Sequence, residues 1–97
     1  MSKLNKLKPD PNAEGNHTTF IEDIYGYILK YATYIRNILN PTGYDEVKRV
    51  DLFGDEHFNK KINEMIDTPH VHEKGIPGNI RKANEEEIPK RNRRENQ

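Results

Sequence analysis

The apolar residues in the first half of the chain are concentrated between positions 20 and 39, and this run constrains the fold most. They recur at steps of three and four, which is the period of an amphipathic helix. Thr19 precedes the run and Glu22 follows three residues later, which is the pattern of a capping box at a helix N-terminus. Pro41 and Gly43 would end the helix. The sequence therefore predicts one long helix over residues 20–39.

The second half of the chain changes to the alternation that is typical of strands. Residues 44–53 and 70–72 are predicted as strands, 58–66 as a short helix, 79–83 as a further strand and 84–88 as a turn or helix start. A helix followed by strands in so short a chain predicts an α+β fold, in which an N-terminal amphipathic helix packs on a small antiparallel sheet.

Composition limits this fold to one small domain. The chain has 97 residues, of which 32% are hydrophobic and 33% are charged. The usual apolar share of a globular chain is roughly 45–50%, so we expect a small core and long polar loops. The chain contains no cysteine, which excludes disulfides and thiolate metal sites. No stretch has the length of a membrane span, and no signal peptide is recognisable.

Charge and turn residues suggest how the chain is organised. Positive and negative side chains balance to a net charge of zero, but lysine and arginine dominate both ends. Residues 1–16 contain prolines, a glycine and several asparagines, and we expect a flexible leader there. Residues 17–89 would form the folded domain, and residues 90–97 a basic tail. Each basic end is either a solvated tail or an arm that contacts phosphate.

Three of the four histidines lie within sixteen positions, and they are the best candidates for chemistry. Histidine is the residue type that titrates near neutral pH, and His57, His70 and His72 concentrate it in this part of the chain. If residues 70–72 are extended, His70 and His72 share one face of a strand, because side chains alternate with a period of two. Two imidazoles could act as general acid and base on RNA. Four cations would then stabilise charge on the phosphate: Lys48, Arg49, Arg81 and Lys82.

Two alternatives to acid–base catalysis remain open for the same histidines. His57, His70 and His72 could bind a divalent metal such as zinc, with Asp51 or Glu73 as a fourth ligand. The histidines could also be exposed loop residues with no role, because a His-x-His pair occurs in many surface loops.

Several segments of the second half together resemble a known group of proteins. They are residues 49–54 (RVDLFG), 57–58 (HF), 68–73 (TPHVHE), 78–83 (GNIRKA) and 85–89 (EEEIP). This pattern is similar to the C-terminal toxin modules of bacterial polymorphic toxins, which end large secreted proteins of the contact-dependent inhibition type. The nearest group is polymorphic toxin type twenty-four. The resemblance covers about residues 48–89, and the Thr-Pro-His-Val-His segment is its most specific part.

The resemblance implies a nuclease, and in particular a ribonuclease that attacks tRNA or other RNA in the cytoplasm of a competing cell after delivery. It also implies a cognate immunity protein that blocks the site, and a small RNase-like fold with N-terminal helices and a four-stranded antiparallel sheet. The three histidines become catalytic candidates, supported by Asp51, Thr68 and Arg81. Thr68 would orient a histidine or the phosphate.

The low apolar content also suits a protein without enzymatic activity. A small chain that becomes ordered on a partner, such as an inhibitor, needs few apolar residues of its own. Failure to cleave any nucleic acid would favour this interaction module.

Overall fold

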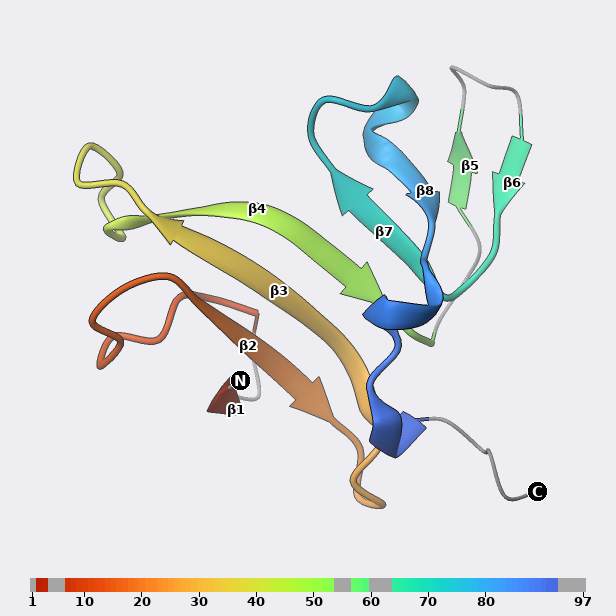
Figure 1. Ribbon diagram of the computed structural model, residues 1–97, viewed down its shortest axis with the longest axis horizontal. Helices are drawn as coiled ribbons and strands as arrows, with labels where there is room; N and C mark the ends of the chain where they lie inside the picture. Colours follow the sequence, from red (N-terminus) through yellow and green to blue (C-terminus); the bar gives the residue numbers. More distant parts are fainter. Residues whose placement is uncertain (1, 4–6, 54–56, 60–63, 93–97) are drawn as a thin grey trace.

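The chain forms a twisted sheet of strands, with no long helix among the described residues (Figure 1). The computed structural model describes residues 2–3, 7–53, 57–59 and 64–92. Six strands pair in the order β1-β2-β3-β4-β7-β8, while β5 and β6 form a separate two-stranded sheet. All neighbouring pairs are antiparallel except β1 with β2.

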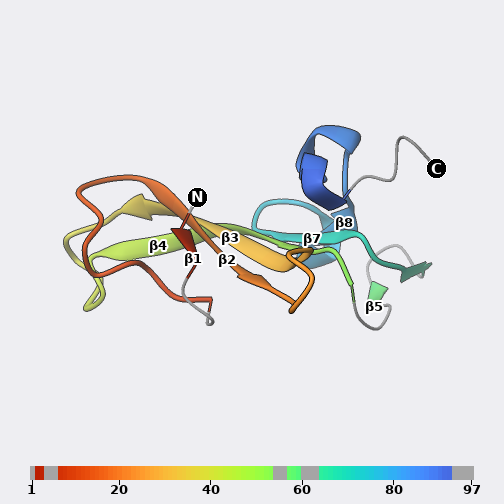
Figure 2. The ribbon, with the colours of Figure 1, turned by 90° about the horizontal axis from the view of Figure 1, so that it is seen from below.

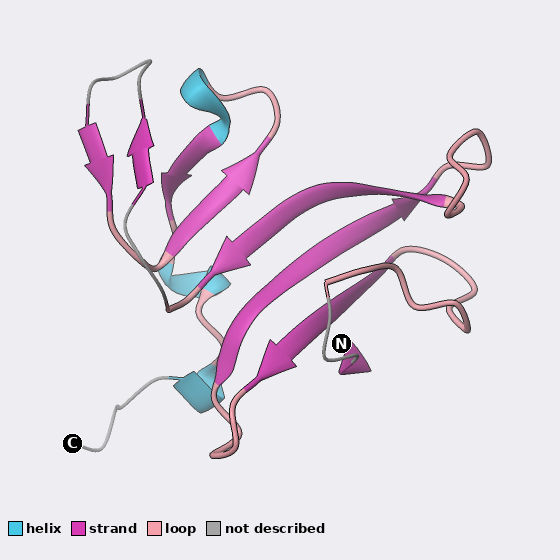
Figure 3. Ribbon diagram, turned by 180° about the vertical axis from the view of Figure 1, so that it is seen from behind, coloured by secondary structure: helices cyan, strands magenta, loops and turns pink. Residues whose placement is uncertain are grey.

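The strands are β1 (Ser2–Lys3), β2 (His17–Glu22), β3 (Ile28–Arg36), β4 (Tyr44–Asp51), β5 (His57–Asn59), β6 (Glu64–Ile66), β7 (His70–Glu73) and β8 (Ile80–Lys82). The helical segments of the described residues are three short 3₁₀ turns (Figure 3): Pro77–Asn79, Glu85–Glu87 and Lys90–Asn92.

The predicted helix over residues 20–39 is wrong, because a turn divides this run into β2 and β3. The side chain of Asp23 accepts hydrogen bonds from the backbone N–H groups of Tyr25 and Tyr27, at 2.8 and 3.1 Å. Gly26 has a φ of 85°, a left-handed conformation that glycine adopts without steric cost. These residues reverse the chain, and Phe20 then pairs with Tyr31 in the neighbouring strand. The run therefore folds as a hairpin.

The apolar spacing that suggested a helix mixes buried strand residues with exposed turn residues. Ile24 is 90% exposed in the turn between β2 and β3. Ile38 and Leu39, 80% and 90% exposed, lie in the turn between β3 and β4. Aromatic and β-branched residues also favour strands, so the rest of the run is compatible with β structure.

The predicted α+β fold class is wrong for the same reason, since the helix that defined it is absent from the described residues. The predicted short helix over 58–66 is also wrong, because its described residues belong to β5 and β6. Strands over 44–53, 70–72 and 79–83 are confirmed as β4, β7 and β8. Gly54 and Asp55 also predict a turn after β4, and they lie outside the described residues.

One face of the sheet carries the larger apolar cluster. Phe20, Tyr31, Val50 and Val71 pair in turn across β2, β3, β4 and β7, so their side chains share this face. Ile28 and Leu52 complete the buried cluster, and Ala83 and Ile88 pack against it. Figure 2 shows the C-terminal segment, residues 83–92, on one side of the sheet. This segment covers the apolar cluster.

Glu87 fixes the C-terminal segment to the sheet. Its carboxylate accepts hydrogen bonds from Arg81 at 2.8 and 2.9 Å and from Lys48 at 2.8 Å. The Tyr31 hydroxyl donates to the Glu87 carbonyl oxygen. A capping box joins Asn84 and Glu87. Thr19 and Glu22, where the sequence predicts a capping box, lie in strand β2 instead.

Residues 7–16, predicted to be part of a flexible leader, pack on the other face of the sheet. Leu7 and Ala13 contact a second apolar cluster of Ala32, Tyr34 and Tyr44. The ring of His17 holds this segment, because Nε2 accepts from the Asp10 backbone N–H at 2.9 Å and Nδ1 lies 2.8 Å from the Gly15 carbonyl. No helix of the described residues has the length and apolar character needed to cross a membrane.

Candidate functional site

The pairing of β4 with β7 brings the sequence-predicted histidines to Asp51. Asp51 pairs with His70, and Arg49 pairs with His72. These four residues lie on the face opposite the larger apolar cluster, because Val50 and Val71 point into that cluster. We call this face the histidine face. The prediction that His70 and His72 share a face is confirmed, and Val71 between them is buried.

The imidazoles of His70 and His72 both approach one oxygen of the Asp51 carboxylate. Asp51 Oδ2 lies 3.2 Å from His70 Nε2 and 3.3 Å from His72 Nε2. The two imidazole rings meet edge to face, with centroids 5.0 Å apart and an interplanar angle of 81°. Asp51 is thus hydrogen-bonded to the ring of His70 and in charge contact with that of His72.

Arg49 holds the carboxylate from the same strand. Its Nε and Nη2 bind the two oxygens of Asp51 at 3.0 and 3.1 Å, a bidentate contact that adds geometric specificity. Burial alone raises the pKa of Asp51, but hydrogen bonds and charge from Arg49, followed by the charges of His72 and Lys30, lower it below its usual range. Asp51 is thus a carboxylate at neutral pH, suited to stabilise a protonated imidazole.

The two histidines differ in solvent exposure. His70 is 2% exposed, whereas the side chain of His72 is 26% exposed. His72 also lines a hollow of about 230 Å³ where β4 and β7 diverge, together with Val47, Lys74 and Asn79. His72 is therefore the more accessible of the two rings, although its Nε2 is buried on the side of Asp51.

Two cations flank the row that contains Asp51 and His70. Lys30 pairs with Asp51 across β3 and β4, and Lys82 pairs with His70 across β7 and β8. Direct cross-strand pairs share a face, so both lysines belong to the histidine face. Together with Arg49 they make this part of the sheet cationic.

The structure places the other sequence-predicted residues elsewhere. Arg81 lies on the opposite face and binds Glu73 and Glu87, so it belongs to the network that holds the C-terminal segment. Lys48 binds Glu87 in the same network. Thr68 precedes β7 in a cis peptide bond with Pro69. The backbone of His57 lies in β5, but its side chain lies outside the described residues.

Two residues of interest were missed by the sequence analysis. Lys30 was assigned to the predicted helix, and only the alternation of β3 places it beside Asp51. His17 was not considered, although its ring packs edge to face on Tyr44 at 4.7 Å. A histidine at the start of an aromatic run was the only available signal for that contact.

Asp51, His70 and His72 form a group that could hold a metal ion. Their ligand atoms all lie within 4.8 Å of one another. Tetrahedral zinc with bonds of about 2.0–2.1 Å separates its ligands by roughly 3.3 Å, and the two distances from Asp51 match this value. Glu73, predicted as a possible fourth ligand, is bound to Arg81 on the other face. Arg49 opposes a metal, because its guanidinium already binds the same carboxylate.

Comparison with known proteins found no matching family model, no matching curated protein and no matching solved structure.

Proposed function

We propose that this chain is an endoribonuclease that cleaves RNA, with tRNA as the first substrate to test, by acid–base chemistry at His72. The observation that carries the proposal is the Asp51 carboxylate, which contacts two imidazoles and an arginine on one face of the sheet. An imidazole positioned by a carboxylate is a common general base. His72 is the more accessible member of the pair.

The reaction assigns a separate role to each residue. His72 takes the proton from the 2′-hydroxyl, whose oxygen then bonds to phosphorus while the bond to the 5′-oxygen breaks. The products are a 2′,3′-cyclic phosphate and a 5′-hydroxyl end, whose oxygen takes a proton from water while the protonated His72 returns its proton to water. Asp51 stabilises the protonated His72, and His70 is a positioning residue because it is buried against Asp51.

The cations of the histidine face would bind the phosphate. Arg49, Lys30 and Lys82 surround the Asp51–His70 pair on three strands. Charge develops on the phosphate oxygens in the transition state, and fixed cations stabilise that charge. Arg49 and Lys82 belong to the sequence-predicted set and Lys30 is added to it, whereas Lys48 and Arg81 are left out because they are bound to Glu87.

A metal-dependent nuclease is the second candidate, favoured by the ligand atoms of Asp51, His70 and His72, which lie within 4.8 Å of one another. A bound zinc ion would supply an activated water and polarise the phosphate. We rank this candidate second because the bidentate contact from Arg49 brings positive charge within 3.1 Å of the same oxygen.

The biological role follows from the same proposal. The resemblance of residues 48–89 to polymorphic toxin modules supports a toxin that is delivered into the cytoplasm of a target cell. A cognate immunity protein would bind the histidine face and block it.

Incubation of the purified chain with total tRNA, with and without EDTA, tests the chemistry. We expect cleavage that survives EDTA and disappears in His72→Ala. Cleavage lost with EDTA would favour the metal site instead. A failure to cleave RNA or DNA would contradict both nucleases and favour an interaction module. A matched control is Arg36→Ala, which changes an exposed cation at the opposite end of β3 from Lys30 and should retain cleavage.

A further inference from the structure

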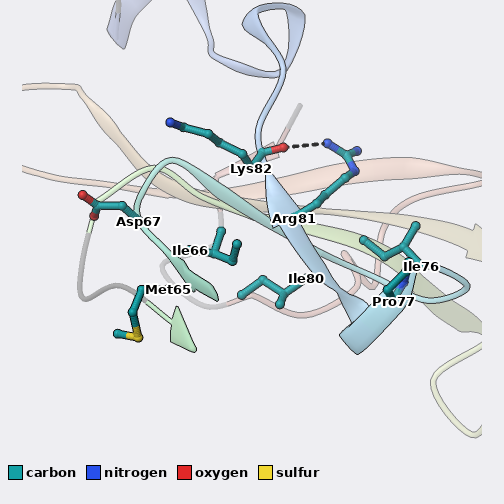
Figure 4. A pocket seen from close by; sticks show the side chains of 8 residues that line it. All are labelled: Met65, Ile66, Asp67, Ile76, Pro77, Ile80, Arg81 and Lys82. Carbon is teal, nitrogen blue, oxygen red and sulfur yellow. Dashed lines mark hydrogen bonds between the residues drawn. The ribbon is translucent and has the colours of Figure 1, made fainter. Parts of the chain in front are cut away.

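A larger hollow of about 500 Å³ lies beside β8, next to β6. Figure 4 shows Ile66 and Ile80 facing one another within it, with Met65 nearby and with Asp67 and Lys82 on the same side. Ile66 and Ile80 are 7% and 3% exposed and form the apolar wall. Its volume lies within the range of about 300–1,000 Å³ that is usual for small-ligand sites.

Strand pairing connects this hollow to the histidine face. Ile80 pairs with His72, and Lys82 pairs with His70. Neighbouring strands are about 4.8 Å apart, so the wall of the hollow begins one strand from the proposed catalytic pair. A ligand group bound in the hollow would therefore be only a few covalent bonds away from a group of the same ligand held at His72.

The chemistry of the lining fits a flat, apolar ring that carries donor groups. Aliphatic side chains and a thioether pack against such a ring, and Met65 can adapt its shape to it. The Asp67 carboxylate can accept hydrogen bonds from the N–H groups of a base edge. Lys82 can meet the attached phosphate. A nucleobase with its phosphate satisfies all three features.

We propose that this hollow binds the nucleobase of the nucleotide next to the cleaved phosphate, and that it gives the enzyme a base preference. The inference builds on the proposed ribonuclease function, because that function places a phosphate at His72. It adds a separate binding site, formed by Met65, Ile66, Ile80 and Lys82, which should bind nucleotides even when cleavage is prevented.

Methionine methyl NMR tests the site directly, because the chain contains only two methionines and the other is at position 1. The probes are the four nucleoside 5′-monophosphates, with ribose 5-phosphate and inorganic phosphate as controls. We expect a saturable shift of the Met65 methyl signal with at least one nucleotide and none with the controls. Met65→Leu assigns the signal. No nucleotide-induced shift, or an equal shift with ribose 5-phosphate, would overturn the proposal.

The His72→Ala variant separates this proposal from the proposed function. Because His72 does not line the hollow, the variant should keep the nucleotide-induced shift while it loses cleavage. If the wild type binds nucleotides but cleaves no RNA, the pocket stands and the ribonuclease proposal fails. If the wild type cleaves RNA but no nucleotide shifts Met65, only the pocket proposal fails. In Met65→Ala, sequencing of the cleavage products should show a flattened base preference.

Discussion

Asp51 and His70 face one another across strands β4 and β7, with Asp51 Oδ2 3.2 Å from His70 Nε2. The same oxygen lies 3.3 Å from the more exposed His72. One carboxylate therefore links a buried imidazole to a more exposed one. Arg49 keeps this carboxylate ionised and fixed in place. The proposed chemistry depends on this arrangement.

Asp51→Asn should greatly lower RNA cleavage while leaving the fold intact. The amide keeps the shape of the carboxylate but cannot stabilise a protonated His72. General acid–base catalysis contributes about 10²–10⁴-fold, so we expect a loss of that order in kcat. Steady-state cleavage of a labelled tRNA measures it, and far-ultraviolet circular dichroism checks the fold. Unchanged kcat in a folded variant would remove Asp51 from the mechanism.

Glu87→Gln should destabilise the protein at neutral pH and make its free energy of unfolding depend less on pH below 4.5. Hydrogen bonds from Arg81, opposed by burial and helped by Asn84 and Lys48, lower the pKa of Glu87 from 4.5 to about 2. Because the pKa of Glu87 is lower in the folded state than in the unfolded state, its charge stabilises the fold above pH 4.5, and this contribution is lost as the pH falls toward 2. Removing one partner of a buried ion pair costs about 3 kcal/mol at neutral pH.

Urea unfolding of wild type and Glu87→Gln between pH 7 and pH 2 measures this effect. The difference between the two free energies of unfolding should shrink as the pH falls below 4.5. Glu85→Gln is the matched control, because it changes a carboxylate in the same 3₁₀ turn that is exposed. A constant difference across the whole range would show that the Glu87 charge does not hold the C-terminal segment.

Tyr31→Phe should cost about 1 kcal/mol, the usual net value of one hydrogen bond, because it removes the hydroxyl that donates to the Glu87 carbonyl. Burial, followed by the charge of Glu87, raises the pKa of Tyr31 to about 12. The neutral phenol thus stabilises the fold below pH 10, and this contribution is lost as the pH rises through 12. Ultraviolet absorbance of phenolate in wild type and variant follows the titration. Ionisation of all five tyrosines near pH 10 in the folded protein would contradict the raised pKa of Tyr31.

Removal of residues 1–16 should destabilise the sheet, although the sequence predicts a flexible leader there. Leu7 and Ala13 cover the cluster of Ala32, Tyr34 and Tyr44, and the Tyr44 hydroxyl donates to the Ala13 carbonyl at 2.9 Å. Uncovering this cluster returns apolar surface to water. Thermal unfolding of full-length and truncated chains measures the loss. Equal melting temperatures would show that the segment acts as a leader only.

The sequence predicted the local strand pattern of the second half but not the fold. The His-x-His prediction succeeded because a period of two follows from strand geometry alone. The run over 20–39 was compatible with both helix and strand, and the turn at Asp23 and Gly26 decided between them. The spacing of the apolar residues does not show whether a turn interrupts the run, so the predicted fold class was wrong.

The candidate site was predicted in part, because its residues depend on strand register. Asp51 meets His70 only through the pairing of β4 with β7, which are separated by residues 52–69. Arg81 was chosen for its charge, yet alternation along β8 places it opposite Ile80 and Lys82 on the other face. Lys30 was missed because its segment was assigned to a helix. Whether His57 joins the site remains a prediction from sequence.

The ends of the RNA fragments produced in EDTA test the central claim most directly. Mass spectrometry of tRNA digested by the wild-type chain should find fragments that end in 2′,3′-cyclic phosphate, and His72→Ala prepared in parallel should leave the tRNA intact. This result would establish metal-independent attack by the 2′-hydroxyl with His72 as the base. Intact tRNA with the wild type, or the same fragments with His72→Ala, would contradict the account.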